Sequence, residues 1–353
     1  MDASQLLQKA VELQTSDIFL ISGMPVAYKI NGVIETQEGG RLSPDDTESL
    51  LRELYGMAGG RDIEQFLAEG DDDFSFAMPG VSRFRVSTYK QRGSLAAVIR
   101  VVTFDLPNPA ELGIPPIVLQ LAHRPKGLIL VTGPAGSGKS TTLACMIDEI
   151  NKACYKHVIT LEDPLEYLHS HKKSIVSQRE VFTDTHSYVH ALRAALRQAP
   201  DVILLGEMRD HETITVAMTA AETGHLIIST LHTIGAANTI DRVVDAFPPN
   251  QQQQIRIQLS MVLQAVVSQQ LIPTADDKVA VAFEIMLVNS AVRNMIRESK
   301  VHQLDTVIYS SAGEGMIAMD ASILKLFREG VVSEREALAF AANPDTLQKK
   351  MKL

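Results

Sequence analysis

The stretch that decides the fold is GLILVTGPAGSGKS, residues 127–140. Its second half matches the pattern G-x-x-x-x-G-K followed by serine or threonine, between a predicted strand and a helix that begins near Lys139. Glycines let backbone N–H groups approach phosphates, and a helix N-terminus favours anions. We therefore predict that Lys139 reaches the β and γ phosphates of ATP, as a binding and catalytic residue, and that the Ser140 hydroxyl binds Mg²⁺. The predicted nucleotide-binding residues are Gly133, Pro134, Ala135, Gly136, Ser137, Gly138, Lys139, Ser140 and Thr141.

From residue 127 onward, short apolar runs alternate with segments of helix length. The runs are 128–131, 158–161, 202–205 and 226–229. This alternation is typical of βαβ units and predicts an α/β domain built on a parallel sheet. Each run is followed at once by polar or acidic residues. Because the carboxyl ends of parallel strands share one edge, where ligands bind, we expect these residues to lie together.

Two acidic residues flank the third run, and only one of them can lie at the ligand edge. Strand residues rise roughly 3.3 Å each, so Asp201 and Glu207 are expected about 20 Å apart. Glu207 follows the third run, so we expect it at the same sheet edge as the phosphate-binding loop. We predict that it polarises the attacking water or orders Mg²⁺, and we interpret Asp201 as structural.

Polar residues after the second and fourth runs complete the predicted site. Glu162 is predicted to be catalytic, by helping to position Mg²⁺ or the lytic water. Asp163 and Glu166 remain open between that role and a solvated acidic turn. Thr230 and His232 follow the fourth run, where an imidazole is placed to sense the γ-phosphate.

The first hundred residues have a different pattern, that of a smaller α+β domain. Strand-like segments at 18–21 and 26–30 lead to Asn31-Gly32, a hairpin signal, so a small mixed sheet is expected. Residues 43–46 predict the start of a helix reaching about Tyr55, and strands resume at 74–77, 84–89 and 95–102. Four prolines between 105 and 116 favour extended backbone. We predict domains at 1–104 and 117–353, joined by a proline-rich linker at 105–116.

Composition excludes several classes of protein. Acidic residues outnumber basic ones by 42 to 33, for a net charge of −9, which argues against a nucleic-acid partner. The two cysteines form neither a disulfide framework nor a structural zinc site. The N-terminus resembles an amphipathic helix rather than a signal peptide, so we expect a cytoplasmic protein. The uncharged run 257–275 contains too many polar residues for a membrane span and predicts a buried helix followed by a strand.

Four ordered motifs resemble those of the secretion and type IV pilus ATPase family. They are GPAGSGKST, LEDPLEY, DVILLGEMRD and TGHLIISTLHT, similar to its Walker A, Asp box, Walker B and His box. The last motif adds His225 to the predicted phosphate sensor. A further segment, AVRNMIRE at 291–298, is similar to AIRNLIRE of the pilus retraction ATPases of the PilT type.

The resemblance implies a homohexameric ring in which a RecA-like domain and a smaller, PAS-like N-terminal domain rotate against each other. ATP hydrolysis would then power pilus retraction and twitching motility. The implied partner is a platform protein of the inner membrane, at its cytoplasmic face, and a second retraction ATPase is left open as a further partner. Departures at Gln198-Ala199, Val292, Met295 and SDIFLIS leave open an accessory ring subunit of the PilU type with little turnover of its own.

Two pairs of arginines are also predicted to function. Arg85 and Arg100 match basic positions of the family and are expected to complete the site of a neighbouring subunit, because phosphoryl transfer needs added positive charge. The alternative is a pair of solvated arginines on a strand face. Arg293 and Arg297 lie four residues apart on one helix face, where like charges repel unless something acidic receives them. We expect them to couple the ring to a partner, against the alternative of a salt-bridged surface helix.

Overall fold

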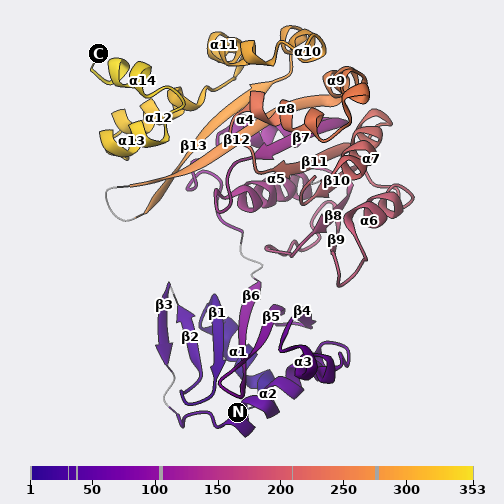
Figure 1. Ribbon diagram of the computed structural model, residues 1–353, viewed down its shortest axis with the longest axis vertical. Helices are drawn as coiled ribbons and strands as arrows, with labels where there is room; N and C mark the ends of the chain where they lie inside the picture. Colours follow the sequence, from indigo (N-terminus) through magenta and orange to yellow (C-terminus); the bar gives the residue numbers. More distant parts are fainter. Residues whose placement is uncertain are drawn as a thin grey trace. The chain divides into compact units, whose positions relative to one another are not determined.

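The structure is a computed structural model that describes residues 2–30, 32–36, 39–102, 106–208, 210–274 and 278–352. These residues form two compact units, which divide between Val102 and Leu106 (Figure 1). Of the predicted hairpin turn, Asn31 lies outside the described residues. Within the described ranges, no helix combines the length and apolar character needed to span a membrane.

The first unit is an antiparallel sheet with three helices on one face. The helices are α1 (Ala3–Glu12), α2 (Pro44–Met57) and α3 (Ile63–Glu69). The strands follow the order β3-β2-β1-β6-β5-β4, and all their described pairings are antiparallel. The expectation of a mixed sheet is therefore wrong. Short connections join β1 to β2 to β3 and β4 to β5 to β6 as antiparallel neighbours, and β6 pairs antiparallel with β1. The strands are β1 (Asp17–Ile21), β2 (Ala27–Ile30), β3 (Val33–Thr36), β4 (Asp71–Met78), β5 (Ser82–Gln91) and β6 (Ser94–Val102).

Local sequence explains the start and the packing of α2. Ser43 and Asp46 form a reciprocal capping box, and Pro44 occupies the first helical turn. Leu50, Leu51 and Leu54 are buried in one cluster with Phe84 and Val86 of β5 and residues of α1 and α3. The alternate residues of β5 and β6 therefore face away from the helices.

The second unit is an α/β domain around a sheet whose described strands follow the order β13-β12-β7-β11-β10-β8-β9. The four predicted strands are confirmed as β7 (Gly127–Thr132), β8 (His157–Glu162), β10 (Val202–Leu205) and β11 (Leu226–Leu231), all mutually parallel. The parallel edge strand β9 (Ile175–Glu180) and the antiparallel hairpin β12 (Leu263–Pro273) and β13 (Val279–Leu287) extend this core.

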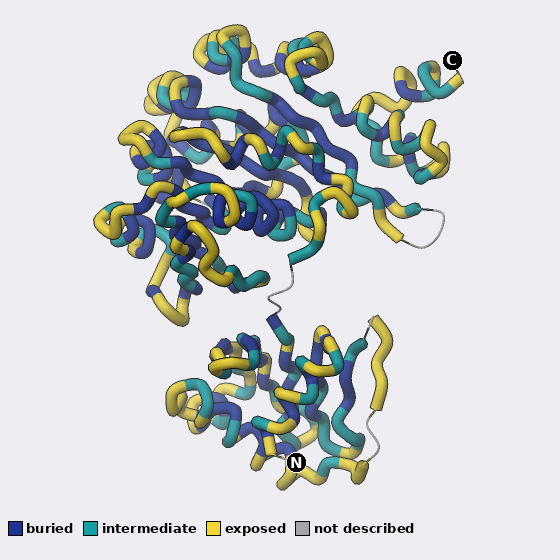
Figure 2. The backbone as a smooth tube through the Cα atoms, turned by 180° about the vertical axis from the view of Figure 1, so that it is seen from behind, coloured by how far each residue is buried: buried dark blue, intermediate teal, exposed yellow. Residues whose placement is uncertain are grey.

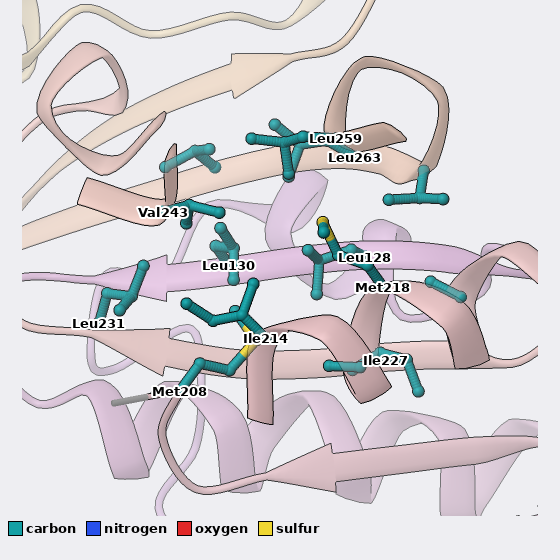
Figure 3. Packing of buried hydrophobic residues seen from close by; sticks show 14 of the residues in the cluster. Leu128, Leu130, Met208, Ile214, Met218, Ile227, Leu231, Val243, Leu259 and Leu263 are labelled. Atoms are coloured by element: carbon teal, nitrogen blue, oxygen red, sulfur yellow. The ribbon is translucent and has the colours of Figure 1, made fainter. Parts of the chain in front are cut away.

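Helices cover both faces of this sheet. One face packs on α4 (Pro116–Leu121) and α5 (Lys139–Ala153), and the other on α6 (Tyr188–Ala195), α7 (His211–Glu222), α8 (Ala236–Asp245) and α9 (Pro249–Val262). Figure 3 shows Leu128 and Leu130 of β7 beside Ile214 and Met218 of α7. Since both faces are covered, every residue of β7 and β11 is buried (Figure 2). The helix and strand predicted within 257–275 are present as α9 and β12, but α9 is buried on one face only, because Ile257 and Met261 are exposed.

Short helices complete the second unit after β13. Met319 and Ile323 of α12 are buried with Ala337 of α13 and Leu347 of α14, in a small cluster that also includes Ile272 of β12. The helices are α10 (Ser290–Arg297), η1 (Val301–Gln303), α11 (Leu304–Ser310), η2 (Ala312–Glu314), α12 (Met319–Arg328), α13 (Glu334–Phe340) and α14 (Pro344–Met351). Of these helices, the sequence predicted only α10, at residues 291–298.

Candidate nucleotide-binding and hydrolysis site

The loop between β7 and α5 has the geometry of a phosphate-binding loop. Gly133, Gly136 and Gly138 adopt φ values of +146°, +74° and +84°. A side chain at Gly133 would place its Cβ 2.2 Å from the Gln269 carbonyl oxygen, so only glycine fits there. The residue before α5 is Gly138, and no side-chain hydrogen bond caps the N-terminus of this helix. This arrangement fits an anion.

Lys139 lies against the inside of the loop. Its side chain is buried, and its ammonium donates hydrogen bonds of 2.9 Å to the carbonyls of Gly133 and Pro134. Ser140 and Thr141 follow on the first turn of α5 and are half-buried. The ammonium, the hydroxyl of Ser140 and the uncapped N–H groups form a set of donors and oxygen ligands that fits a nucleotide phosphate with Mg²⁺.

Glu207 lies at the carboxyl end of β10, near His232. The Glu207 side chain is 12% exposed, and its Oε2 lies 3.4 Å from His232 Nε2. Both residues line a cavity of about 540 Å³ together with Thr230 and Arg242. Since β11 separates β7 from β10, the predicted acid is two strands away from the phosphate-binding loop at the same sheet edge.

Backbone-directed hydroxyls fix the relative position of these strand ends. Thr230 Oγ1 donates to the Gly206 carbonyl at 2.5 Å, and Ser229 Oγ donates to the Leu205 carbonyl at 2.7 Å. Gly206 itself has no room for a side chain, because a Cβ there would meet the Tyr188 hydroxyl at 2.7 Å. The Thr230 hydroxyl is thus engaged with the backbone beside Glu207.

Glu162 is the last residue of β8, next to β10 in the sheet. Its Oε1 accepts a 3.4 Å hydrogen bond from Gln178 of β9, and the residue is half-buried. The structure therefore brings the ends of β7, β11, β10 and β8 into one row, in that order. Asp201 lies at the other end of β10, where its carboxylate accepts from the His157 backbone N–H at 2.8 Å.

The prediction that His225 belongs to the phosphate sensor is contradicted by the strand register. His225 precedes β11, whose Leu226 is paired with Gly127 at the start of β7, whereas Leu231 is paired with Thr132 at its end. A strand of six residues spans roughly 20 Å. His225 therefore lies at the opposite edge from the loop, where its Nδ1 is 3.0 Å from the Ala220 carbonyl.

Arg85 and Arg100 are register partners on adjacent strands of the first unit. They face away from the helices, so their guanidinium groups lie on the same side of the sheet. The Arg100 side chain is 66% exposed, and its Nε donates to Asp17 Oδ1 at 3.0 Å. This geometry joins the two charges on one surface.

Arg293 and Arg297 differ in their surroundings, which corrects the expectation of an unreceived charge pair. Arg293 Nη1 donates to the carbonyls of Ser260 and Met261 at 3.3 and 3.2 Å. These carbonyls end α9, where the helix dipole attracts a cation. Arg297 is exposed, while Val292 and Ile296 are buried as the apolar face predicted. Arg293 thus joins α10 to the end of α9.

The sequence did not predict the role of the buried polar residues of β12 and β13. Ser268 and Gln269 are no more than 1% exposed, and Ser268 is opposite Glu284 in the register. Burial raises the pKa of the Glu284 carboxyl, and its hydrogen bond from the Ala236 N–H acts against that shift. Two adjacent glutamines in an otherwise apolar strand were the available signal, because buried amides need partners.

Comparison with known proteins places these features in a family. The family model described as type II/IV secretion system protein matches residues 2–311. PilT of Pseudomonas aeruginosa, a type IV pilus retraction ATPase, is 42% identical over 345 residues, which cover 98% of this chain and 99% of PilT. A twitching motility protein of Neisseria gonorrhoeae is 48% identical over 276 residues, covering 78% and 74% of the two chains. The crystal structure of the pilus retraction motor PilT with ADP has a TM-score of 0.88 and 46% identity, and the match covers 99% of each chain.

The fold and the site define a nucleotide-binding P-loop protein of the α/β class. The phosphate-binding loop, its uncapped helix and the row of strand ends are the features on which that class rests. The chain belongs to the family of type II/IV secretion system proteins. The resemblance to the secretion and pilus ATPases, predicted from four sequence motifs, is confirmed, and so is the resemblance to the pilus retraction ATPases, predicted from the segment 291–298.

Proposed function

We propose that this protein is a hexameric ATPase motor that powers type IV pilus retraction, and thereby twitching motility, by ATP hydrolysis. The observation that carries the proposal is the row of strand ends, with Glu207 two strands from the phosphate-binding loop of Lys139. It brings an acid and a cation to one edge of one sheet. The proposal agrees with the family relationship and with the similarity to the pilus retraction ATPases named above.

In the proposed reaction, the residues of the sequence motifs have the following roles. Lys139 exchanges its loop carbonyls for the β and γ phosphate oxygens and neutralises their charge. Ser140 and Glu207 would hold Mg²⁺, and the bound ion would withdraw charge from the phosphates. Glu207 also orients the attacking water, and Glu162 assists from the next strand end. His232 and Thr230 sense the γ-phosphate. Because His232 Nε2 lies 3.4 Å from Glu207 Oε2, a shift of the imidazole toward the γ-phosphate would also change the surroundings of the acid.

Room for the rest of the nucleotide lies next to the loop. A cavity of about 1360 Å³ is lined on one side by Gly138, Thr141 and Thr142. We infer that the ribose and base occupy this cavity, since the phosphates at the N-terminus of α5 direct the remainder of the molecule toward it.

The finer features belong to the same proposal. We propose an N-terminal domain of PAS-like type at 1–104, a linker at 105–116 and a RecA-like ATPase domain at 117–353. The ring would act at the cytoplasmic face of the inner membrane, on the platform protein of the pilus machine, alone or with a second retraction ATPase. Neither nucleic acid nor structural zinc has a place in this mechanism.

Deleting the gene tests the function. Without retraction, pili that are assembled are not withdrawn, so we expect more surface pili per cell and no twitching. Wild-type complementation should restore both. Unchanged pilus number in the deletion strain would contradict the retraction role. ATPase activity of the purified hexamer then separates a motor from an accessory ring subunit, which would turn over little ATP.

Arg85 and Arg100 are proposed to act on the site of a neighbouring subunit. Their position on one sheet face supports this, because two guanidinium groups side by side gain when they meet a phosphate. Arg100 would leave Asp17 to do so; its own side chain is 66% exposed, and the buried Asp17 carboxylate would keep the hydrogen bond from Ser16 Oγ.

Mixed hexamers test action between subunits. Arg100→Ala and Lys139→Ala rings should each be inactive, because every interface lacks one component. Mixing the two chains creates some interfaces with an intact loop and an intact arginine, so we expect partial recovery of ATPase activity at intermediate ratios. Arg92→Ala, an exposed arginine between β5 and β6, serves as the matched control. Activity that stays absent at every ratio would refute the assignment.

The coupling role now rests on Arg297, because Arg293 holds the end of α9. We propose that Arg297 contacts a partner that receives the motion. In the complementation assay above, Arg297→Ala should keep ATPase activity and fail to lower the pilus number, whereas Arg293→Ala should lower the thermal unfolding temperature. Retraction at the wild-type rate by Arg297→Ala would show that the helix is only part of the fold.

A further inference from the structure

The side chain of Gln269 bridges three elements of the second unit. It lies on β12, 1% exposed, next to the phosphate-binding loop. Its Nε2 donates to the Ser137 carbonyl at 2.5 Å, and its Oε1 accepts from Thr142 Oγ1 at 2.9 Å. One amide group thus joins the loop, the second turn of α5 and the sheet.

The backbone of the same residue also shapes the loop. The Gln269 carbonyl oxygen occupies the space that a side chain at Gly133 would need, and Nε2 lies 3.2 Å from the Cβ position of Gly138. The contact with the Gln269 carbonyl therefore requires glycine at position 133, and the Gln269 side chain packs closely against Gly138. The β7 and β12 pairing, in which Ser268 is opposite Thr132, sets this contact.

Ser268, the residue before Gln269, holds the segment between β11 and α8. Ser268 Oγ accepts from the Gly235 N–H at 2.9 Å, and Glu284 Oε1, opposite on β13, accepts from the Ala236 N–H at 2.8 Å. Gly235 and Ala236 begin α8 directly after the segment that carries His232. Adjacent positions on β12 thus fix both the phosphate-binding loop and the segment after β11.

We propose that Gln269 is a positioning residue for ATP binding, whose amide holds the phosphate-binding loop in the shape that presents its N–H groups to the phosphates. This inference rests on the proposed function of the site and adds a residue to it. An amide is specifically suited, because one atom must donate to a carbonyl while the other accepts from a hydroxyl. A carboxylate would face the Ser137 carbonyl without a proton between them.

Gln269→Glu tests the proposal against Gln264→Glu. Gln264 lies on the same strand, half-buried, and its amide contacts the Val262 carbonyl away from the loop. We expect Gln269→Glu to raise the Kd for ATP and the KM about tenfold or more, with a smaller change in kcat, because a buried acceptor loses its donor. Gln264→Glu should stay within about twofold of wild type. Binding is measured by fluorescence titration with an ATP analogue, beside thermal unfolding.

A neutral variant covers the case in which the buried charge prevents folding. Gln269→Leu keeps the approximate size and should weaken ATP binding about fivefold, since it removes both hydrogen bonds without adding charge. A folded Gln269→Glu or Gln269→Leu chain that binds ATP as tightly as wild type overturns the proposal. Failure of the wild-type chain to hydrolyse ATP would instead sink the proposed function, while the binding comparison would still test Gln269.

Discussion

Glu207→Gln is expected to lower ATP turnover by roughly 10²- to 10⁴-fold, the range that a positioned acid or base contributes. The amide has nearly the same shape, so the Thr230 and Gly206 contact beside it should persist. The glutamine amide cannot accept a proton from the attacking water, and it has no negative charge to attract Mg²⁺. ATP binding should therefore survive, and the purified protein should retain bound, unhydrolysed nucleotide.

Turnover and retained nucleotide are both measured on the same preparation. Glu222→Gln is the matched control, because Glu222 is an exposed residue at the end of α7 in the same unit. It should hydrolyse ATP as wild type does. If Glu207→Gln turns over ATP at a near-normal rate, the acid has been assigned wrongly, and Glu162 at the next strand end becomes the residue to test.

Lys139→Ala should abolish turnover for a different reason, because binding itself fails. The lysine ammonium neutralises phosphate charge in the ground state as well as in the transition state. Hydrogen bonds to charged groups contribute roughly 1.5–3 kcal/mol each, so we expect the Kd for ATP to rise about 10- to 100-fold. Titration with a fluorescent ATP analogue measures this.

Lys126→Ala provides the comparison for that experiment. Lys126 is exposed and lies just before β7, at the opposite end of the strand from the loop. Its loss should leave ATP affinity unchanged. Tight ATP binding by Lys139→Ala would mean that the uncapped N-terminus of α5 holds the phosphates without the lysine, and the assignment of its role would be rejected.

Much of the candidate site follows from the sequence because its signals are local. The glycine-rich loop, with the apolar run before it and the helix start after it, is recognisable within 14 residues. The direction of the strand is enough to place Glu207 at the ligand edge and Asp201 at the opposite edge. Parallel strand ends share an edge, so Glu162, Thr230 and His232 were also placed correctly relative to that edge. The strands at 128–131, 158–161, 202–205 and 226–229 are all present.

The errors came from features that depend on partners distant in the chain. A motif spanning a whole strand put His225 with Thr230 and His232, although its two ends lie at opposite edges of the sheet. Helical spacing showed Arg293 and Arg297 as one charged face. It did not show that the end of α9, more than 30 residues earlier, receives Arg293.

By itself, the sequence determined the α/β class, the phosphate-binding loop and the acid that faces it, because each depends on residue order within a strand, loop and helix. Only the tertiary structure decided which residues hold that loop in shape. Gln269 is 127 residues from Thr142 along the chain, and it reaches the loop because β12 pairs with β7. Such a contact is set by strand order in the sheet, for which a local pattern gives no signal.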